Sequence, residues 1–454
     1  MSGKDEKTIT QTKKPMISAI MSAIVWGSGQ AFICKQKGKG FLFFLVQMIF
    51  ITIELSTGYI VHTMMGMVPV FDVRVHGGFF SKAIWGFLTL GQVKMEDHSI
   101  RLMVIGVIAI VILVILAFFY YYVIIDAFQS AQKYEEDNQI VTLKQFVRHI
   151  SGDLFPQMML TPLGILFLLV TVLPIICTIL VAFTDYSRNV LPPGNLISWV
   201  GLENFIKLVN VPIWTQTFLN ILGWTLIWAT SVSLISYFFG MFQALLLSSI
   251  EGPSRKVYQA ILILPWAIPS MITLLYLRTT LNGQFGQLNV FLLEKGIITE
   301  AIPFLSDPTL AKIVVIVVAV FLSFPSFMLM MLGVFSGADE SWYEAANIDG
   351  ANKIQQFLHI TFPYVFTATA PLLIMNFAFN FNGFGIIYFL TDGGPVNSEY
   401  QFAGHTDILI SWIYDLTLSQ QMYGMASVMS ILIFAFVGTI AVWNLKRTVS
   451  FKNL

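Results

Sequence analysis

The sequence predicts an all-α, polytopic membrane protein with about eight transmembrane helices. Hydrophobic residues make up 56% of the 454 residues and charged residues only 11%, whereas a soluble domain carries roughly 25% charged residues. Apolar stretches of about 20 residues, the length that crosses the hydrocarbon core of a bilayer, recur along the chain. The polar segments between them are too short to form soluble domains.

The spanning helices are expected at eight apolar stretches. In chain order they are 40–62, 102–125, 157–183, 215–248, 259–278, 311–335, 364–390 and 423–445. A further stretch, 16–33, is interrupted by GSGQ and followed by Lys35, Lys37 and Lys39. We expect it to form an interfacial or re-entrant helix, with a ninth span as the open alternative.

Polar segments divide the chain into four expected parts. These are a cytoplasmic tail with the interfacial helix (1–39), a transmembrane hairpin (40–125), a cytoplasmic linker (126–155) and a transmembrane core (156–454). Lysine and arginine residues set the orientation, because they are enriched in cytoplasmic loops. With the N-terminus inside, sixteen lie on the cytoplasmic side and nine outside. The sequence therefore predicts cytoplasmic termini in a plasma membrane, and the polar N-terminus shows no cleaved signal peptide.

Several function classes find no support in the sequence. The net charge is zero, which gives no reason to expect nucleic acid as a partner. Cys34 and Cys177 lie far apart, so neither a structural disulfide nor a metal site is expected. No G-x-x-x-x-G-K-[ST] phosphate loop occurs. We expect no cofactor and no ATP hydrolysis on this chain.

Residues 342–364, WYEAANIDGANKIQQFLHITFPY, form an unusual polar segment between two apolar stretches. Ser341 and Glu344 have the spacing of a capping box, and Gly350 stands where a left-handed glycine can end a helix. A second short helix is expected to end at Pro363. Its apolar face would carry Ile354, Phe357 and Leu358. By these residues alone, the helix–turn–helix is either a membrane-surface connector or a docking element.

The same segment resembles the EAA signature of ABC-importer permeases, E-A-A, three residues, G, nine residues, I-x-L-P. Six of the seven signature positions match, and Phe362 stands where the signature has leucine. The matching residues are Glu344, Ala345, Ala346, Gly350, Ile360 and Pro363. The resemblance implies that residues 339–363 are the coupling segment, which docks in a groove of a cytoplasmic ATPase.

Further motifs resemble the MalF-type permease, the larger membrane subunit of maltose/maltodextrin importers. They are VGLENFIKL (200–208), ILPWAIPS (263–270), FLSDP (304–308), FNFNGF (379–384), LTDGGP (390–395) and WNLKR (443–447). The resemblance implies a type I ABC-importer permease fold and a non-catalytic subunit. The implied partners are a second, MalG-type permease, a cytoplasmic ATPase dimer and a sugar-binding protein. The enteric form has a large insertion where 184–214 is short, which implies a lipid-anchored extracellular binding protein.

Polar side chains on the stretch 364–390 suggest where a sugar would bind. Asn376, Phe379, Asn380 and Gly383 follow helical spacing. Asparagine can donate to and accept from sugar hydroxyls, although interhelical hydrogen bonding explains such residues equally well. The resemblance favours the sugar, because Asn376, Phe379 and Asn380 coincide with sugar-contacting positions of the family.

The resemblance carries over five more candidate sugar contacts near prolines. They are Leu322, Ser323 and Ser326 beside Pro325, and Trp266 and Ser270 beside Pro265 and Pro269. Ala319 and Ser326 replace an asparagine and a tyrosine of the enteric type. The wall of the site is therefore expected to be smaller and less polar, which would accommodate a longer or differently placed oligosaccharide.

The expected function is import of maltose/maltodextrin-type oligosaccharides by alternating access, driven by ATP hydrolysed on a partner chain. Raffinose-type or galactan-derived oligosaccharides are alternative substrates. An ion-coupled sugar carrier is a second alternative, but it would hold acidic or histidine residues in mid-membrane, and only Glu54 lies clearly within an expected span. A membrane glycosyltransferase is a third, and no carboxylate constellation supports it.

Overall fold

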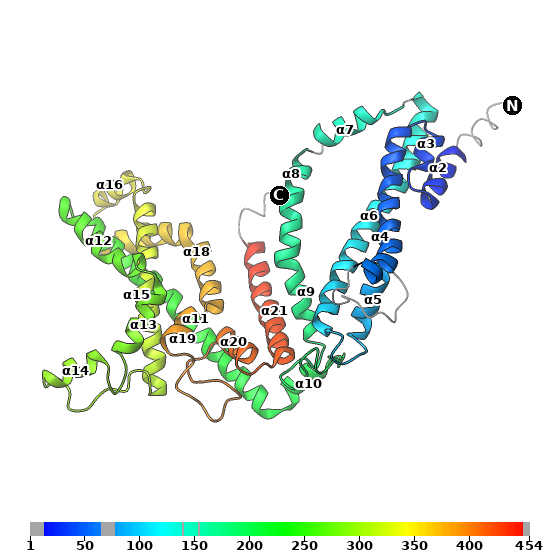
Figure 1. The fold of residues 1–454 in the computed structure, drawn as a ribbon. Coiled ribbons are helices and arrows are strands. Elements are labelled where there is room, and N and C mark those ends of the chain that lie inside the picture. The colour runs from blue at the N-terminus through cyan, green and yellow to red at the C-terminus, as the bar shows by residue number, and fades with distance from the viewer. Residues whose placement is uncertain (1–12, 65–77, 139, 153–154, 448–454) are drawn as a thin grey trace. The chain divides into compact units, whose positions relative to one another are not determined.

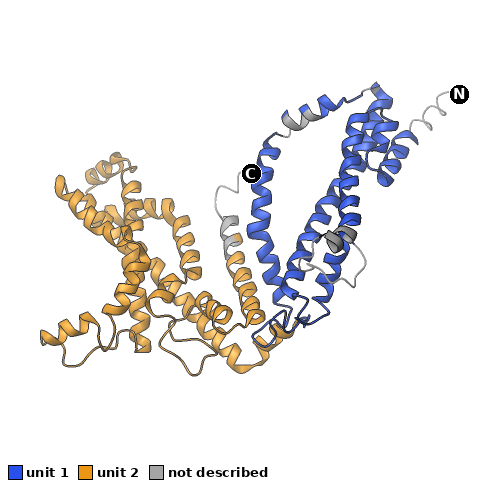
Figure 2. Cartoon of the chain, in the orientation of Figure 1, with its two compact units in different colours: residues 1–201 blue, residues 202–454 orange. Residues whose placement is uncertain are grey.

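The computed structural model describes the chain except residues 1–12, 65–77, 139, 153–154 and 448–454. Every named element in the described residues is a helix, and β-structure there is limited to three isolated bridges (Figure 1). The predicted all-α fold is therefore confirmed. The chain divides into two compact units, residues 1–201 and 202–454 (Figure 2). The four-part division expected from the sequence stays a prediction.

Unit 1 contains nine helical segments over its described residues. They are α2 (Lys13–Ile24), α3 (Ser28–Phe32), α4 (Lys37–Met64), α5 (Phe79–Thr89), α6 (Ser99–Asp137), α7 (Leu143–Gly152), α8 (Phe155–Phe167), η1 (Leu168–Val172) and α9 (Leu173–Val181). The expected hairpin corresponds to α4 and α6, and α8, η1 and α9 together form one apolar segment, Phe155–Val181. The first part of the expected linker continues as α6, because its residues 126–137 stay helical.

The stretch 16–33 is broken into α2 and α3, and neither is long enough to span a membrane. The break falls at Gly27, whose φ of +84° is a left-handed conformation that favours glycine. Gln30 on α3 donates to Asp126 on α6 (3.1 Å), and Lys39 on α4 pairs with the same carboxylate (2.6 Å). These buried polar contacts hold α3, α4 and α6 together at one end of the hairpin.

Unit 2 contains the remaining helices. They are α10 (Glu203–Asn210), α11 (Pro212–Ser248), α12 (Pro253–Ala267), α13 (Ser270–Thr280), α14 (Gln287–Glu294), α15 (Pro308–Phe335), α16 (Glu340–Ile348), α17 (Lys353–Gln356), η2 (Phe357–Thr361), α18 (Phe362–Asn382), α19 (Gly385–Leu390), α20 (Leu409–Leu418) and α21 (Tyr423–Arg447).

The core of unit 2 forms where α11 packs against α15 and α18. Tyr237, Met328 and Val365, one from each helix, are fully buried there. Gly240 lets α11 and α15 approach closely, because a Cβ at that position would lie 2.7–2.9 Å from atoms of α15. The Tyr237 hydroxyl also lies 2.8 Å from the Thr369 hydroxyl on α18. This packing fixes the helices that carry the two candidate sites described below.

The spans agree with the expected eight helices, with two differences. Among the described residues, six helices are long and apolar enough to cross a membrane. The pair α12–α13 adds a seventh if counted as one span, and α21 has a shorter apolar part, Tyr423–Thr439. The stretch 259–278 is not one straight helix, since α12 and α13 meet at 85° beside Pro269, the N-cap of α13. The stretch 364–390 is also divided, because α18 ends at Asn382.

Candidate functional site

The coupling segment, residues 339–363, forms α16, a turn and the start of a long helix at one end of α15 (Figure 1). Asp339 is the N-cap of α16 and accepts a hydrogen bond from the Ser341 amide at 2.9 Å. The predicted capping box between Ser341 and Glu344 is therefore wrong. The helix begins two residues earlier than that box requires, because aspartate is an equally good N-cap.

The turn after α16 depends on Gly350, as predicted. Its φ is +78°, a left-handed conformation that costs an L residue energy. Asn352 then starts the next helix in a capping box with Gln355, with both hydrogen bonds at 2.9 Å. A turn that requires glycine, followed by a well-capped helix, gives the segment a defined shape.

The predicted end of the second helix at Pro363 is wrong. The chain continues without a break through α17, η2 and α18, so Lys353–Asn382 is one segment of 30 residues. Pro363 lies at the start of α18, after the π-helical turn η2 (Phe357–Thr361). A widened turn before a proline accommodates the ring and the missing amide hydrogen bond. The coupling segment is therefore joined directly to α18.

Three side-chain contacts hold α16 against the helix that follows it. The Tyr343 and Thr361 hydroxyls lie 3.1 Å apart, and Gln356 donates to the Asn347 side chain at 2.6 Å. The rings of Trp342 and Tyr364 are in edge contact with centroids 5.4 Å apart. A displacement of α16 would therefore act on the first turns of α17, η2 and α18.

The outward face of the coupling segment is uncovered. Glu344 and Ala345 are exposed, Ile348 is 88% exposed and Ile354 is 70% exposed. Ile360, by contrast, is half-buried. Exposed apolar patches are typical of surfaces that bind other molecules.

The predicted sugar contacts on α18 differ in burial. Asn380 is buried (5% exposed) and donates to Ser233 on α11 at 3.1 Å and to Asn376 at 2.7 Å. Phe379 is 73% exposed, and Gly383 follows the last residue of the helix. Asn380 thus makes the interhelical contact that was the alternative to sugar binding, and Phe379 is open. Sugar contact at these positions stays a prediction.

The other predicted contacts lie on α15 and around the bend of α12–α13. Leu322 is buried, and the Ser326 hydroxyl donates to the Ser323 carbonyl at 2.7 Å. Trp266 and Ser270 are exposed on either side of the bend. Among the described residues, no side-chain hydrogen bond joins these residues to Asn376 or Asn380, so the structure does not bring the predicted set into one polar cluster.

The sequence did not predict a second feature, the 391–408 loop between α19 and α20. Three hydrogen bonds hold the loop and the first residue of α20 against α11. They run from Trp224 to the Thr406 carbonyl (3.1 Å), from the Gln401 amide to Thr217 (2.9 Å) and from the Leu409 amide to Thr225 (3.0 Å). Thr406 and Asp407 are buried. The loop is therefore an ordered part of unit 2.

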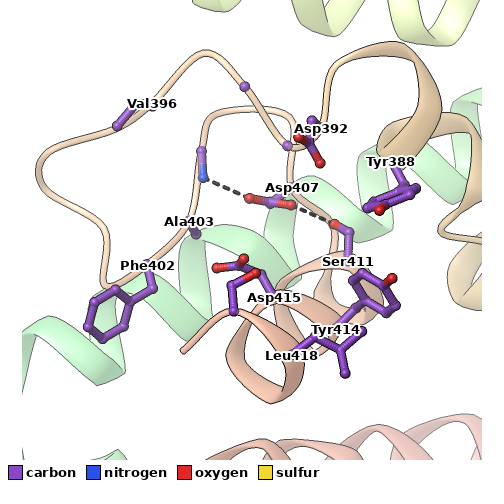
Figure 3. A pocket seen from close by; sticks show the side chains of 14 residues that line it. Tyr388, Asp392, Val396, Phe402, Ala403, Asp407, Ser411, Tyr414, Asp415 and Leu418 are labelled. Atoms are coloured by element: carbon purple, nitrogen blue, oxygen red, sulfur yellow. Dashed lines mark hydrogen bonds between the residues drawn. The ribbon is translucent and has the colours of Figure 1, made fainter. Parts of the chain in front are cut away.

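A pocket of about 490 Å³ lies between this loop, α19 and α20 (Figure 3). Its wall includes Tyr388, Tyr414, Asp392 and Asp415. Burial raises the pKa of Asp407, which also lines the pocket, from 3.8 to about 6, although hydrogen bonds from Gly404 and Ser411 oppose the rise. A signal was present in the sequence, since three aspartates fall within 24 residues of a chain poor in charge, but nothing in the spacing showed that they share a pocket.

Comparisons with known proteins identify the family of the chain. The family model described as binding-protein-dependent transport system inner membrane component matches residues 236–450. The chain is 35% identical to the galactooligosaccharides transport system permease protein GanP of Bacillus subtilis (strain 168), over 84% of this chain and 90% of that protein. It is 33% identical to the maltodextrin transport system permease protein MdxF of the same organism, over 98% of both chains.

The fold also resembles a solved structure. A crystal structure of a bacterial ABC transporter involved in the import of the acidic polysaccharide alginate contains a chain that superposes with a TM-score of 0.54 at 22% identity. The match covers 66% of this chain and 96% of that chain. The similarity shows a shared fold.

Proposed function

The chain belongs to the family of binding-protein-dependent transport system inner membrane components, and we propose that it is the permease subunit that moves maltodextrin-type oligosaccharides into the cell in an ATP-driven ABC importer. Similarity to the maltodextrin permease MdxF along 98% of both chains carries the assignment. A galactooligosaccharide is the second candidate substrate, because the similarity to GanP reaches 35% identity.

In this proposal ATP is hydrolysed on a cytoplasmic ATPase dimer that docks on the coupling segment. The exposed Ile348 and Ile354 supply apolar contact area, and Glu344 supplies a charge for a basic residue in the ATPase groove. A second permease of the MalG type completes the pathway, and a lipid-anchored extracellular binding protein delivers the sugar. This chain contributes the path and no catalytic group.

The continuous segment Lys353–Asn382 supports a direct mechanical link. One end of it contacts α16 through Gln356 and Thr361, and the other end carries Phe379 and Asn380. Movement of the ATPase that tilts α16 would therefore shift these residues. We assign sugar contact to Phe379, Asn376 and Asn380, so that ATP binding and release alternately expose them to the two sides of the membrane.

The proposed orientation places both termini and the coupling segment in the cytoplasm and the 391–408 loop outside. A cysteine at Asn352 should react only with reagents that enter the cytoplasm. A cysteine at Ser398 should react with an impermeant reagent added to whole cells. Each of these cysteines is introduced into a chain in which Cys34 and Cys177 are replaced by serine. Labelling of the cysteine at 352 from outside would contradict the orientation.

The function is tested by ATP turnover. The chain is purified with its partner permease, ATPase and binding protein in nanodiscs, and ATP hydrolysis is measured with maltotetraose and with a galactotetraose of the same length. We expect sugar-loaded binding protein to stimulate ATP hydrolysis strongly. The stimulation should be greater with maltotetraose than with galactotetraose. If only galactotetraose stimulates ATP hydrolysis, the substrate is a galactooligosaccharide and not a maltodextrin. Uptake by this chain alone, driven by an ion gradient without the ATPase, would overturn the proposal.

A further inference from the structure

The pocket beside the 391–408 loop has the size of a ligand site. Its volume of about 490 Å³ falls within the roughly 300–1,000 Å³ of typical small-molecule pockets. It lies wholly within unit 2, and its open rim carries Phe402 (41% exposed) and Val396 (90% exposed). Figure 3 shows the aromatic and acidic side chains at its wall.

Aromatic side chains form one part of the wall. The rings of Tyr388 and Tyr414 are in edge contact with centroids 5.1 Å apart. Phe384 stacks on Tyr414 with centroids 4.9 Å apart, which fixes the tyrosine in place. A fixed aromatic ring can pack against the apolar face of a sugar, and the tyrosine hydroxyls can bond its polar edge.

Carboxylates form the other part. Asp392 is exposed and Asp415 is half-buried. Within the described residues, Asp392 forms an ion pair with Arg278 at 4.0 Å, whereas no basic side chain pairs with Asp415. Ionised carboxylates only accept hydrogen bonds, so they suit the hydroxyl donors of a sugar. Asp415, which has no basic partner within the described residues, would repel an acidic sugar through its negative charge.

The wall is held in shape before any ligand arrives. Asp407 is 8% exposed and accepts hydrogen bonds from the Gly404 amide (2.8 Å) and the Ser411 hydroxyl (2.7 Å). Gly393 has a φ of +75°, and a Cβ there would collide with the Asp407 carboxylate. A preorganised wall lowers the ordering cost of binding.

The same acidic side chains do not suit a metal ion. Within the described residues, no group of three or more histidine, cysteine, aspartate or glutamate side chains is placed to hold one. The combination of fixed rings, hydroxyls and acceptor carboxylates matches an uncharged, hydroxyl-rich ligand.

We infer that this pocket is a binding site for a neutral oligosaccharide on the outer side of the transporter, separate from the contacts on α18. The inference rests on the proposed function, which supplies the orientation and the sugar class. At this site Tyr388 and Tyr414 hold a sugar ring and Asp392 and Asp415 accept from its hydroxyls. The site receives neutral sugars and rejects uronic-acid sugars before they reach the membrane path.

Direct binding tests the site. The assembled importer, without binding protein, is placed in nanodiscs, and saturation-transfer NMR is recorded with maltotetraose and separately with trigalacturonate. Asp415→Ala and Phe402→Ala probe the pocket, and Asp415→Asn removes the charge while keeping the shape. Glu399→Gln, an exposed acid of the same loop outside the pocket wall, is the matched control. Asn380→Ala separates this signal from the contacts on α18.

We expect maltotetraose to bind the wild type and Glu399→Gln alike, Asn380→Ala to lose only the part of the signal that comes from α18, and trigalacturonate not to bind. Loss of a hydrogen bond to a charged group should weaken binding to Asp415→Ala about tenfold. Wild-type maltotetraose binding by both Asp415→Ala and Phe402→Ala would overturn the inference. The inference would also fail if pocket variants bind maltotetraose normally but no longer bind the sugar-binding protein when it is added. The pocket would then be a protein-docking surface.

The same importer, with binding protein now added, separates this failure from failure of the proposed function. If ATP turnover responds to loaded binding protein while the pocket variants bind maltotetraose normally, the importer stands and the pocket assignment falls. If no neutral oligosaccharide stimulates turnover of the wild type, the proposed function fails first. Equal binding of trigalacturonate and maltotetraose would overturn the selection by charge.

Discussion

The coupling segment and the 391–408 loop both connect helices of unit 2, but they differ in which side chains they bury. The coupling segment leaves Glu344 and Ile348 in the open. The loop buries Thr406 and Asp407 and bonds itself to α11. The exposed coupling segment is where we propose that another chain docks, whereas the loop is ordered by its own contacts and lines a pocket.

This comparison separates two kinds of sensitivity to mutation. Changes on the exposed face of the coupling segment should disturb assembly with a partner and leave the fold intact. Changes at buried polar groups of the loop should disturb local stability first. Each prediction below tests one side of that contrast.

The largest effect is expected at the turn of the coupling segment. Gly350→Pro should abolish uptake, because proline requires a φ near −65° and the turn has +78°. Glu344→Lys should do the same by reversing an exposed charge. Uptake of labelled maltotetraose and the amount of protein in the membrane are measured together.

The matched control is Glu251→Lys, which reverses another exposed charge in the short connection between α11 and α12. It should transport normally. Normal uptake by both Gly350→Pro and Glu344→Lys would show that the segment is only a connector.

The next largest effect is expected at Asp407. Its pKa is raised by burial to about 6, so its stabilising contribution is present below pH 4 and is lost as pH rises through 6. The loss amounts to about 3 kcal/mol, or on the order of a hundredfold in the opening equilibrium of the loop. Hydrogen exchange of peptides covering 400–408, corrected for intrinsic rates, should show protection falling between pH 4 and pH 7.

Asp407→Asn should remove this pH dependence, because the side chain no longer ionises. Asp415→Asn, which alters an acid closer to solvent, should leave most of it. A wild-type loop whose protection does not change with pH would contradict the destabilisation of the ionised Asp407 by burial.

A smaller effect is expected on α18. Asn380→Ala and Phe379→Ala should raise the half-saturating sugar concentration a few-fold to tenfold, since each loses a hydrogen bond or a ring contact worth about 0.5–1.5 kcal/mol. Basal ATP hydrolysis should persist, because the proposed ATPase contact is the coupling segment and not α18. Uptake and ATP turnover of the assembled importer are measured as functions of maltotetraose concentration.

Ser233→Ala sharpens this test, because it removes the partner of Asn380 on α11 without touching the exposed Phe379. If Ser233→Ala behaves like Asn380→Ala and both impair assembly, Asn380 serves helix packing. Unchanged sugar dependence in Asn380→Ala and Phe379→Ala would remove both from the sugar site.

Local sequence patterns predicted the parts of the structure that depend on neighbours in the chain. The apolar stretches predicted the spanning helices, because an apolar stretch of about 20 residues has the length of a transmembrane helix. Gly350 was predicted as a left-handed turn, which is a property of one residue. The cap of α16 was placed two residues too late, since Asp339 and Ser341 are both good caps and only the fold selects between them.

The parts that failed depend on contacts distant in sequence. Pro363 was expected to end a helix, yet the π-helical turn before it lets the helix continue. The burial of Asn380 and Phe379 could not be predicted from their spacing, because packing against Ser233 buries the first and leaves the second open. The pocket joins Tyr388 to Asp415 across a folded loop, and no periodicity connects them.

The most direct test of the account is whether the open face of the coupling segment is covered by an ATPase. A cysteine at Ile348, which is 88% exposed, is introduced into a chain with Cys34 and Cys177 replaced by serine, and its reaction with a thiol reagent is timed in membranes opened to the reagent. A cysteine at Glu251 is the control. The account predicts slow reaction at 348 when the ATPase is bound, fast reaction after the ATPase is stripped, and no change at 251. Equal rates at 348 with and without the ATPase would contradict it.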